Sequence, residues 1–340
     1  MSKLSSSTGD ILEAITEEEE QEGSRQLSSI FFDSKVFRSA LSKSVTSVAV
    51  ADKFSSSVQT IKGLDGPMSI ALMSNGHIAV TEWRGNSVSV LRKEGFRLLT
   101  FGRRQLSRES IIYNMLSGVP TKNRERHGDS FGELHEPTGI AATRTNQLIV
   151  CDTNNHRLQL FSRTGTPLTT VTGSDVEFKL PYDICIDSSD RVYVSDSGNH
   201  QIHCLTDNFM LSHKIGQKGC APGQFECPLG IAIDKEGFLF VCDRDNSRVQ
   251  KMTTYGNMVA EFKHEHYHYP VKVAVDASSI VYVAYCYIPE VVMFDGQTTE
   301  FIGSFSRHGD KELVRPRGII VDDTGQVYVC DTSSNEILIF

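Results

Sequence analysis

EPTGIAATRTNQLIVCDTNNHRLQLF (136–161) and CPLGIAIDKEGFLFVCDRDNSRVQKM (227–252) are two copies of one pattern. In each copy an apolar run ends at an aspartate, Asp152 or Asp243, and a polar turn follows before an alternating run begins. Short β-rich runs bounded by Asn, Asp, Ser and Gly are typical of strands joined by tight turns, because these residues satisfy local backbone groups and tolerate positive φ. We therefore expect a strand–turn–strand unit at both places.

The same pattern recurs along the chain. Six prolines mark it, with spacings of 70, 44, 47, 42 and 46 residues: Pro67, Pro137, Pro181, Pro228, Pro270 and Pro316. A valine lies thirteen residues after each proline, and an acidic residue lies fifteen residues after five of the six: Glu82, Asp152, Asp196, Asp243 and Asp331. With a last strand before the next proline, each unit holds four strands in about 45 residues, the period of a β-propeller blade. The predicted fold class is all-β, a six-bladed β-propeller of four-stranded antiparallel blades over residues 57–340.

The two ends of this region predict how the ring closes. Phe340 lies 24 residues after Pro316, where the third strand of the last blade should end. The stretch SVQTIKG (57–63) lies just before Pro67 and has the alternation of a strand. We expect this N-terminal strand to complete the last blade, which removes two sheet edges that would otherwise invite aggregation.

Composition sets the remaining boundaries. The 340 residues are 39% hydrophobic and 22% charged, with a net charge of −8, which suits a globular chain with a large core and excludes a strongly basic binder. Residues 1–29 are acidic and Ser-rich and are predicted to be a disordered tail. Residues 30–55 contain β-type runs and are either an added strand or the remnant of a neighbouring module. The N-terminus lacks the apolar core of a secretory signal and no apolar run is long enough to span a membrane, so we expect a cytoplasmic protein with reduced cysteines.

The best copies, with Pro-x-Gly-Ile-Ala followed by Val-x-Asp-x-x-Asn-x-Arg-Val-Gln, resemble NHL repeats. The stretch VTEWRGNSVSVL (80–91) resembles the first blade of the C-terminal propeller in tripartite-motif (TRIM-NHL) proteins. The fifth unit departs most, with Tyr285 in place of the acid and CYIP (286–289) in place of the turn. The resemblance implies a recognition module in a ubiquitin-ligase or post-transcriptional regulation context. The chain has no Cys-x-x-Cys pair and so no RING, and we do not expect it to be an enzyme itself.

A basic insertion indicates where a ligand would bind. The 70-residue spacing is about 25 residues longer than the usual period, and the extra segment 103–126 carries five arginines and Lys122 against two glutamates. In a propeller this segment shares one face with the turns between second and third strands, and Arg315 and Arg317 are further candidates there. The predicted ligand-binding residues on this face are Trp83, Arg84, Arg103, Arg104, Arg124, Arg126, His156, Arg157, Arg244 and Arg248. Such a face suits a protein partner or RNA, with no DNA specificity, no membrane and no cofactor; a solvated loop is the plain alternative.

Three further features have structural explanations. The acidic residue fifteen positions after each proline is expected to accept N–H groups in a turn. Cys151, Cys242 and Cys330 lie one position earlier, where other units have small residues, so we expect them to pack in strands. His264, His266 and His268 alternate in one loop, which suits either metal binding or a solvated, ligand-contacting segment.

The alternative function is a six-bladed propeller enzyme, lactonase- or lyase-like, with a metal ion in the central channel. The first strand of each blade would line that channel. These strands hold no histidine, and their one carboxylate apart from those at strand ends is Asp183, which makes a poor metal cage.

Overall fold

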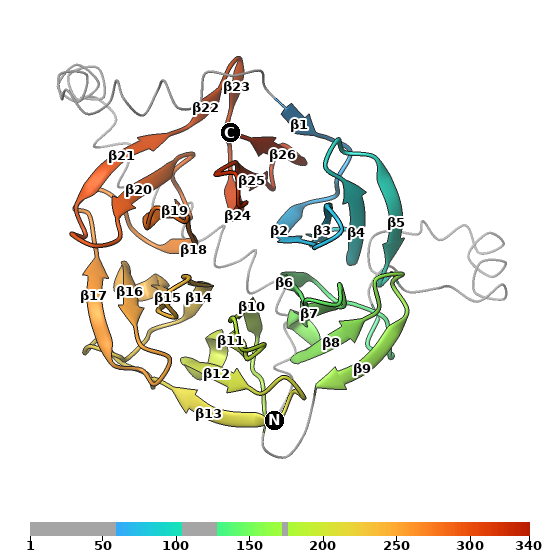
Figure 1. Cartoon of the computed structure of the whole chain (residues 1–340), viewed down its shortest axis with the longest axis horizontal. Coiled ribbons are helices and arrows are strands. Elements are labelled where there is room, and N and C mark those ends of the chain that lie inside the picture. Colours follow the sequence, from blue (N-terminus) through green and yellow to red (C-terminus); the bar gives the residue numbers. More distant parts are fainter. Residues whose placement is uncertain (1–58, 104–127, 172–175) are drawn as a thin grey trace, which may run out of the picture. The chain divides into compact units, whose positions relative to one another are not determined.

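The computed structural model describes residues 59–103, 128–171 and 176–340, which lie within one compact unit, 55–340. Six four-stranded antiparallel sheets stand around a central axis (Figure 1), which confirms the six-bladed β-propeller. Within the described ranges, helix is limited to single 3-10 turns such as η4 (Thr153–Asn155). Across these described ranges, we find no helix that is both long enough and apolar enough to cross a membrane.

Each blade is a meander in which the first strand lies nearest the axis and the fourth at the rim (Figure 1). The first strands are β2 (Pro67–Leu72), β6 (Pro137–Ala142), β10 (Pro181–Ile186), β14 (Pro228–Ile233), β18 (Pro270–Val275) and β24 (Pro316–Val321). The second strands are β3 (His77–Glu82), β7 (Leu148–Asp152), β11 (Val192–Asp196), β15 (Leu239–Asp243), β19 (Ile280–Tyr285) and β25 (Val327–Asp331). The third strands are β4 (Ser87–Arg92), β8 (Arg157–Phe161), β12 (Gln201–Leu205), β16 (Arg248–Met252), β20 (Val291–Asp295) and β26 (Glu336–Ile339). The fourth strands are β5 (Arg97–Phe101), β9 (Pro167–Val171), β13 (Leu211–Ile215), β17 (Met258–Phe262) and β21 (Phe301–Phe305), and a small hairpin, β22 (Arg307–His308) and β23 (Lys311–Glu312), lies in the last linker.

The last blade is closed by the N-terminal strand, as the sequence predicts. Its sheet has the order β1-β26-β25-β24, with β1 (Gln59–Ile61) at the rim. Gln59, Thr60 and Ile61 pair antiparallel with Ile339, Leu338 and Ile337. The Ile61 side chain is buried. The sheet that ends the chain therefore takes its outermost strand from the start of the propeller.

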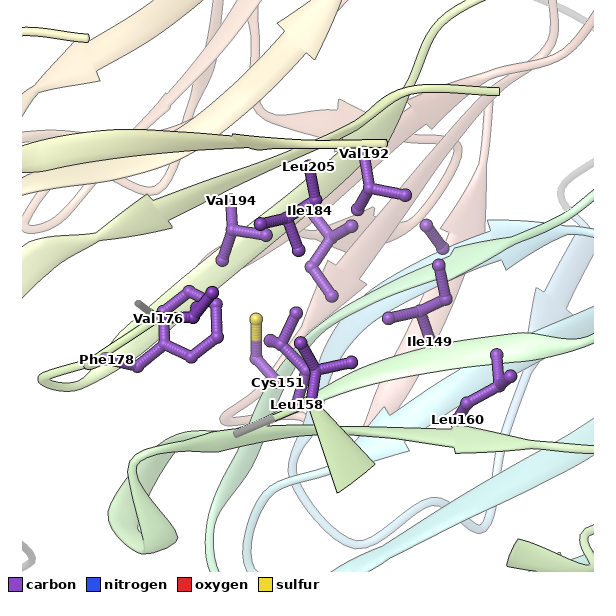
Figure 2. Close-up of a cluster of buried hydrophobic side chains, with 12 residues drawn as sticks. Ile149, Cys151, Leu158, Leu160, Val176, Phe178, Ile184, Val192, Val194 and Leu205 are labelled. Carbon is purple, nitrogen blue, oxygen red and sulfur yellow. The ribbon is translucent and has the colours of Figure 1, made fainter. Parts of the chain in front are cut away.

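The core lies between neighbouring blades. Figure 2 shows one such cluster, in which Cys151 and Leu158 of the second blade point toward Ile184 and Val194 of the third. Near the axis the inner strands approach closely at Gly139, where an added Cβ would lie 2.6 Å from the Cα atom of Asp183. Glycine is thus needed at this place in the second blade, and the neighbouring Cys151 is fully buried, as expected for a strand position that carries small residues.

We expect Cys242→Ser to be tolerated and Cys242→Leu to destabilise the propeller. Cys242 is fully buried between the fourth and fifth blades, in one cluster with Val249 and Val273. Leucine would overpack this site at a cost of roughly 1–3 kcal/mol. Serine has a precedent at the same place in the third blade, where the Ser195 hydroxyl accepts the Asp183 N–H at 2.9 Å. Urea unfolding of the two variants checks this; equal midpoints would remove the small-residue argument.

The direction of the strands defines two faces. Because each first strand starts where the preceding linker ends, the linkers between blades and the turns between second and third strands lie on the same side of the ring. We call this side the linker face, and the side with the other two turns of each blade the opposite face. Residues 1–29, residues 30–55 and most of the basic insertion lie outside the described residues, so the predictions made for them stand as predictions.

Candidate functional site: the linker face

The acidic residue that ends the second strand in five of the six blades anchors the preceding linker to its blade. Asp152 accepts the His135 N–H at 2.7 Å, Asp196 the Lys179 N–H at 2.6 Å and Asp243 the Glu226 N–H at 2.7 Å. The first and last blades repeat the contact through Glu82 and Asp331. In every case the donor lies two residues before the proline of the same blade. The acid therefore has the expected structural role, but these N–H groups belong to the preceding linker and not, as expected, to the acid's own turn.

Two of the predicted ligand-binding arginines belong to this anchor. Arg157 Nε donates to Asp152 Oδ2 at 2.7 Å, and Arg248 Nε donates to Asp243 Oδ2 at the same distance. Each guanidinium also donates to two carbonyl groups of the linker, Ser130 and Glu133 in the second blade and Ala221 and Gln224 in the fourth. Since the side chains are only 13% and 5% exposed, the structure gives both arginines an internal role and leaves little of them on the surface.

His156, another predicted site residue, links two blades. Its Nδ1 atom accepts the N–H of Leu180, the residue before the next proline, at 3.1 Å. His200 accepts the Cys227 N–H in the same way at 3.0 Å, and Asn86 and Asn335 use amide oxygens at the same position. Burial is the main cause that lowers the pKa of His156, with Lys179 adding to the effect. The neutral ring is therefore favoured, and its exposed edge remains on the linker face.

The third blade departs from the anchor pattern at His203. At the same position the second blade has Gln159 and the fourth blade has Gln250. The amide groups of these glutamines donate to the anchoring aspartates at 3.0 and 3.1 Å. His203 Nε2 lies 3.2 Å from Asp196 Oδ2, but neither ring nitrogen is aligned for a hydrogen bond. Burial lowers the pKa of His203 to about 4 and raises that of Asp196 to about 6.

We expect His203→Gln to stabilise the propeller, and to do so more strongly in mild acid. The amide would restore the missing hydrogen bond, worth about 1 kcal/mol at neutral pH. In wild type the buried ring stays neutral while the unfolded chain's histidine takes up a proton below about pH 6.5, so the contribution of His203 to stability falls from there toward a pH of about 4. Melting temperatures of both proteins between about pH 7 and pH 5 check this. A difference in melting temperature between the two proteins that stays constant or becomes smaller in acid would contradict this prediction.

The remaining predicted residues divide into two groups. Trp83 and Arg244 are half-buried, while Arg84 and Arg103 are exposed. Arg84 donates to Asn335 at 3.4 Å, and Arg103 donates to the Ser87 hydroxyl at 3.4 Å, so both sit at the edge of the first blade. The other three residues, Arg104, Arg124 and Arg126, lie outside the described residues.

Acidic side chains lie between these basic ones. Glu136, Glu177, Glu226 and Asp245 belong to the same linkers and turns and are half-buried or exposed. The part of the linker face that the structure describes is therefore mixed in charge. The excess of positive charge expected there comes mainly from the segment 104–127.

The histidine loop packs against aromatic side chains. The His264 ring lies 4.7 Å from that of Tyr267 and 4.8 Å from that of Phe301, between ring centroids. His266 lies 3.3 Å from Glu265, and its N–H donates to His264 Nδ1. Among the residues that the structure describes, no three His, Cys, Asp or Glu side chains are grouped to hold a metal ion. The contacts of His264 thus favour a packing role.

The central channel contains an ion pair that the sequence analysis did not predict. Lys272 Nζ lies 2.5 Å from Asp183 Oδ2, and both side chains are buried. The two residues lie in the fifth and third blades, so the pair spans Gly230 of the fourth. Asp183 also accepts the Ile231 N–H at 2.8 Å. The sequence held a sign of this pair. Asp183 and Lys272 both lie two residues after the proline of their blade, where three other blades have glycine, and they carry opposite charges.

Comparison with known families identifies the repeats. Four segments of the chain, 134–161, 178–205, 225–252 and 313–340, match the family described as NHL repeat. They correspond to the second, third, fourth and last blades, and each begins in the linker and ends at the third strand. The first and fifth blades, which depart most from the pattern, are not among the matched segments.

Curated relatives match parts of the chain. The chain is 26% identical to Protein brain tumor of Drosophila melanogaster over 163 residues. This match covers 46% of this chain and 15% of the relative. It is 25% identical over 181 residues to B-box type zinc finger protein ncl-1 of Caenorhabditis elegans, covering 48% and 19%. A probable peptidyl-alpha-hydroxyglycine alpha-amidating lyase of the same nematode, pgal-1, is 33% identical over 92 residues, covering 25% of each chain. The chain thus spans a fraction of the length of each relative.

Solved structures share the fold. A streptogramin B lyase structure superposes with a TM-score of 0.56 at 15% identity, covering 83% of this chain and 96% of that one. A gluconolactonase from Xanthomonas campestris superposes with a TM-score of 0.60 at 11% identity, covering 86% and 92%. At these identities the likeness shows the overall fold alone and carries no information about function.

Proposed function

We propose that this chain, an NHL-repeat β-propeller that resembles the propeller of TRIM-NHL proteins, is a non-enzymatic recognition platform whose linker face binds a protein partner or RNA. One observation carries the proposal. The positions that repeat from blade to blade, such as Asp243 and Arg248, make internal hydrogen bonds. Exposed residues elsewhere on the linker face, such as Arg84 and Arg103, do not repeat from blade to blade. A rigid frame that presents a varied set of side chains is what a specific binding surface requires.

The resemblance sets the biological context that we propose. Curated relatives include Protein brain tumor and a B-box type zinc finger protein. A ubiquitin-ligase or post-transcriptional regulatory assembly is therefore the proposed setting, with the propeller choosing the target and other segments or subunits supplying chemistry. The proposed location is the cytoplasm.

The channel residues favour binding over catalysis. A metal-dependent propeller enzyme needs several oxygen or nitrogen ligands converging on the axis. The carboxylate of Asp183 is instead neutralised by Lys272 at 2.5 Å and accepts a backbone N–H. Burial also raises the pKa of Cys151 and Cys242, which keeps these thiols protonated and unreactive.

The test is charge reversal of the basic insertion. Changing Arg103, Arg104, Arg124 and Arg126 to glutamate is expected to abolish crosslinked capture of the ligand from cell extract while leaving the melting temperature unchanged. The reason is that guanidinium groups bind phosphates or carboxylates in bidentate fashion and glutamate repels both. The matched control is Arg163→Glu, an exposed arginine in a turn of the opposite face. Equal capture by the quadruple variant and loss by Arg163→Glu would assign binding to the other face.

Ribonuclease treatment and salt separate the two ligand classes. If RNA is the ligand, capture is lost after ribonuclease, and affinity falls steeply with salt because bound cations are released from the phosphates. If a protein is the ligand, capture survives ribonuclease.

A further inference from the structure

The mouth of the central channel on the linker face is built from two positions of each blade. One is the residue after the proline, and the other is the first residue of the turn after the second strand. In three blades the turn residue is a hydroxyl that donates to the next blade's proline carbonyl: Thr153 to Pro181 at 2.9 Å, Ser197 to Pro228 at 2.5 Å and Thr332 to Pro67 at 2.7 Å. The other three blades place Trp83, Arg244 and Cys286 there. The three residues that replace the hydroxyl thus all occupy the same position of their blades, the first residue of the turn after the second strand.

Arg317 is the unusual member of this mouth. It follows Pro316 and is half-buried, yet no carboxylate among the described residues lies within ion-pair distance of its guanidinium. Its neighbours are the Cys286 thiol, to which it is hydrogen-bonded, the Tyr182 hydroxyl and the Arg244 guanidinium, which come from the turn or first strand of other blades. A half-buried guanidinium with no carboxylate beside it has lost hydration without gaining a counter-ion, so an anion bound there would stabilise it.

Tyr182 and Arg244 converge on the same place. Burial raises the pKa of Tyr182 to about 12, and the charges of Arg317 and Arg244 both oppose that rise. Arg244 lies 2.8 Å from Asp245 and over the Tyr269 ring at 5.4 Å, so its charge is partly balanced and its side chain is held in place. Below the mouth, Lys272 and Asp183 neutralise each other. The site is left with a net positive charge that Arg317 supplies.

We propose that this mouth binds a single carboxylate side chain of a protein partner, with Arg317 as the main ligand and Arg244 and the Tyr182 hydroxyl as further donors. This deepens the proposed function and rests on it. A protein carboxylate is favoured over a phosphate chain because Asp245, Glu226 and Glu136 lie on the surrounding turns and linkers. A continuous line of phosphates would be repelled by them, whereas one acidic side chain entering at the axis would meet the guanidinium groups alone.

The test measures the weak binding of a small carboxylate compound to the protein by NMR chemical shifts. Arginine Nε–H signals are recorded on 15N-labelled protein, with the Arg317 signal identified by its loss in Arg317→Lys. Trp83 is the sole tryptophan of the chain, so its indole N–H gives a second, unambiguous reporter at the mouth. The probe is N-acetylglutamate amide, titrated over the millimolar range at constant ionic strength. Its matched control is N-acetylglutamine amide, which has the same shape without the charge.

We expect saturable shifts of the Arg317 signal with the acid and none with the amide. Arg317→Gln should weaken the response of Trp83 by at least about tenfold, since it removes a charged hydrogen bond, and Arg163→Gln should leave it unchanged. No saturable shift with the acid, or the same shift with the amide, would overturn the proposal. Tighter binding of inorganic phosphate than of the acid would also overturn it in favour of a phosphate ligand.

These outcomes are separable from failure of the proposed function. If the acid does not bind while charge reversal of the insertion still abolishes capture, the axial site alone is wrong. If the acid binds at Arg317 while the charge-reversed variant captures its ligand as wild type does, the site stands and the proposed basic contacts are wrong.

Discussion

Deletion of residues 1–63 is expected to leave the propeller unfolded or aggregated. The deletion removes β1, whose three residues pair with Ile337, Leu338 and Ile339. It also removes the buried Ile61, which packs with Tyr328 and Ile339 of the last blade and Ile78 of the first. The exposed edge of β26 (Glu336–Ile339) would be mostly apolar and unpaired, which makes it a template for aggregation. Circular dichroism melting and size-exclusion chromatography measure the effect.

Two controls belong with this deletion. Removal of residues 1–29 leaves β1 in place and should melt like the full chain. Ile61→Ala keeps the backbone pairing and should cost about 2–5 kcal/mol, the usual range for emptying a buried isoleucine site. A 64–340 protein that melts cooperatively at the temperature of the full chain would show that the ring does not need its N-terminal strand.

Asp243→Ala is expected to destabilise the propeller by about 3–5 kcal/mol, because it strips a buried guanidinium of one partner. Asp243 accepts hydrogen bonds from the Glu226 N–H, Asn246, Arg248 and Gln250. Its loss frees the linker before the fourth blade and leaves Arg248 with Glu261 as its remaining carboxylate, at 2.9 Å. Chemical denaturation measures the change.

Asp331→Ala is the matched comparison. Asp331 holds the N–H groups of Val314 and Arg315 and the Ser334 hydroxyl, but no arginine or glutamine occupies the third strand beside it. Its removal should cost about 1–3 kcal/mol, the range for an unsatisfied buried donor. If both alanine variants lost the same stability, the arginine and glutamine contacts would not strengthen the anchor.

Much of the fold could be predicted because a propeller repeats its structure. The proline at the start of each first strand pairs across the sheet with the last residue of the second strand, which is an acid in five of the six blades, as in Pro228 and Asp243. One-dimensional periodicity is enough to place such strands. It also placed β1, because Ile61 falls where the missing fourth strand was needed.

The candidate site was harder to predict because side-chain partners across blades have no fixed spacing. Arg157 and Arg248 lie on the expected face, yet both turn into the linker; their recurrence five residues after the acid was the available signal. The Asp183–Lys272 pair joins the third and fifth blades across the fourth, and an alignment of the repeats does not reveal such a contact. That no carboxylate of the described residues pairs with Arg317 can be seen only once the described linkers are placed in three dimensions.

Photo-crosslinking from the two faces tests the central claim most directly. A benzophenone amino acid is placed at Arg84 or His156 on the linker face, and at Arg163 or Glu236 on the opposite face, all of which are exposed. If the linker face is the recognition surface, irradiation in cell extract yields discrete crosslinked species from the first two positions and background from the other two. Discrete species from Arg163 or Glu236, with none from Arg84 or His156, would contradict the account.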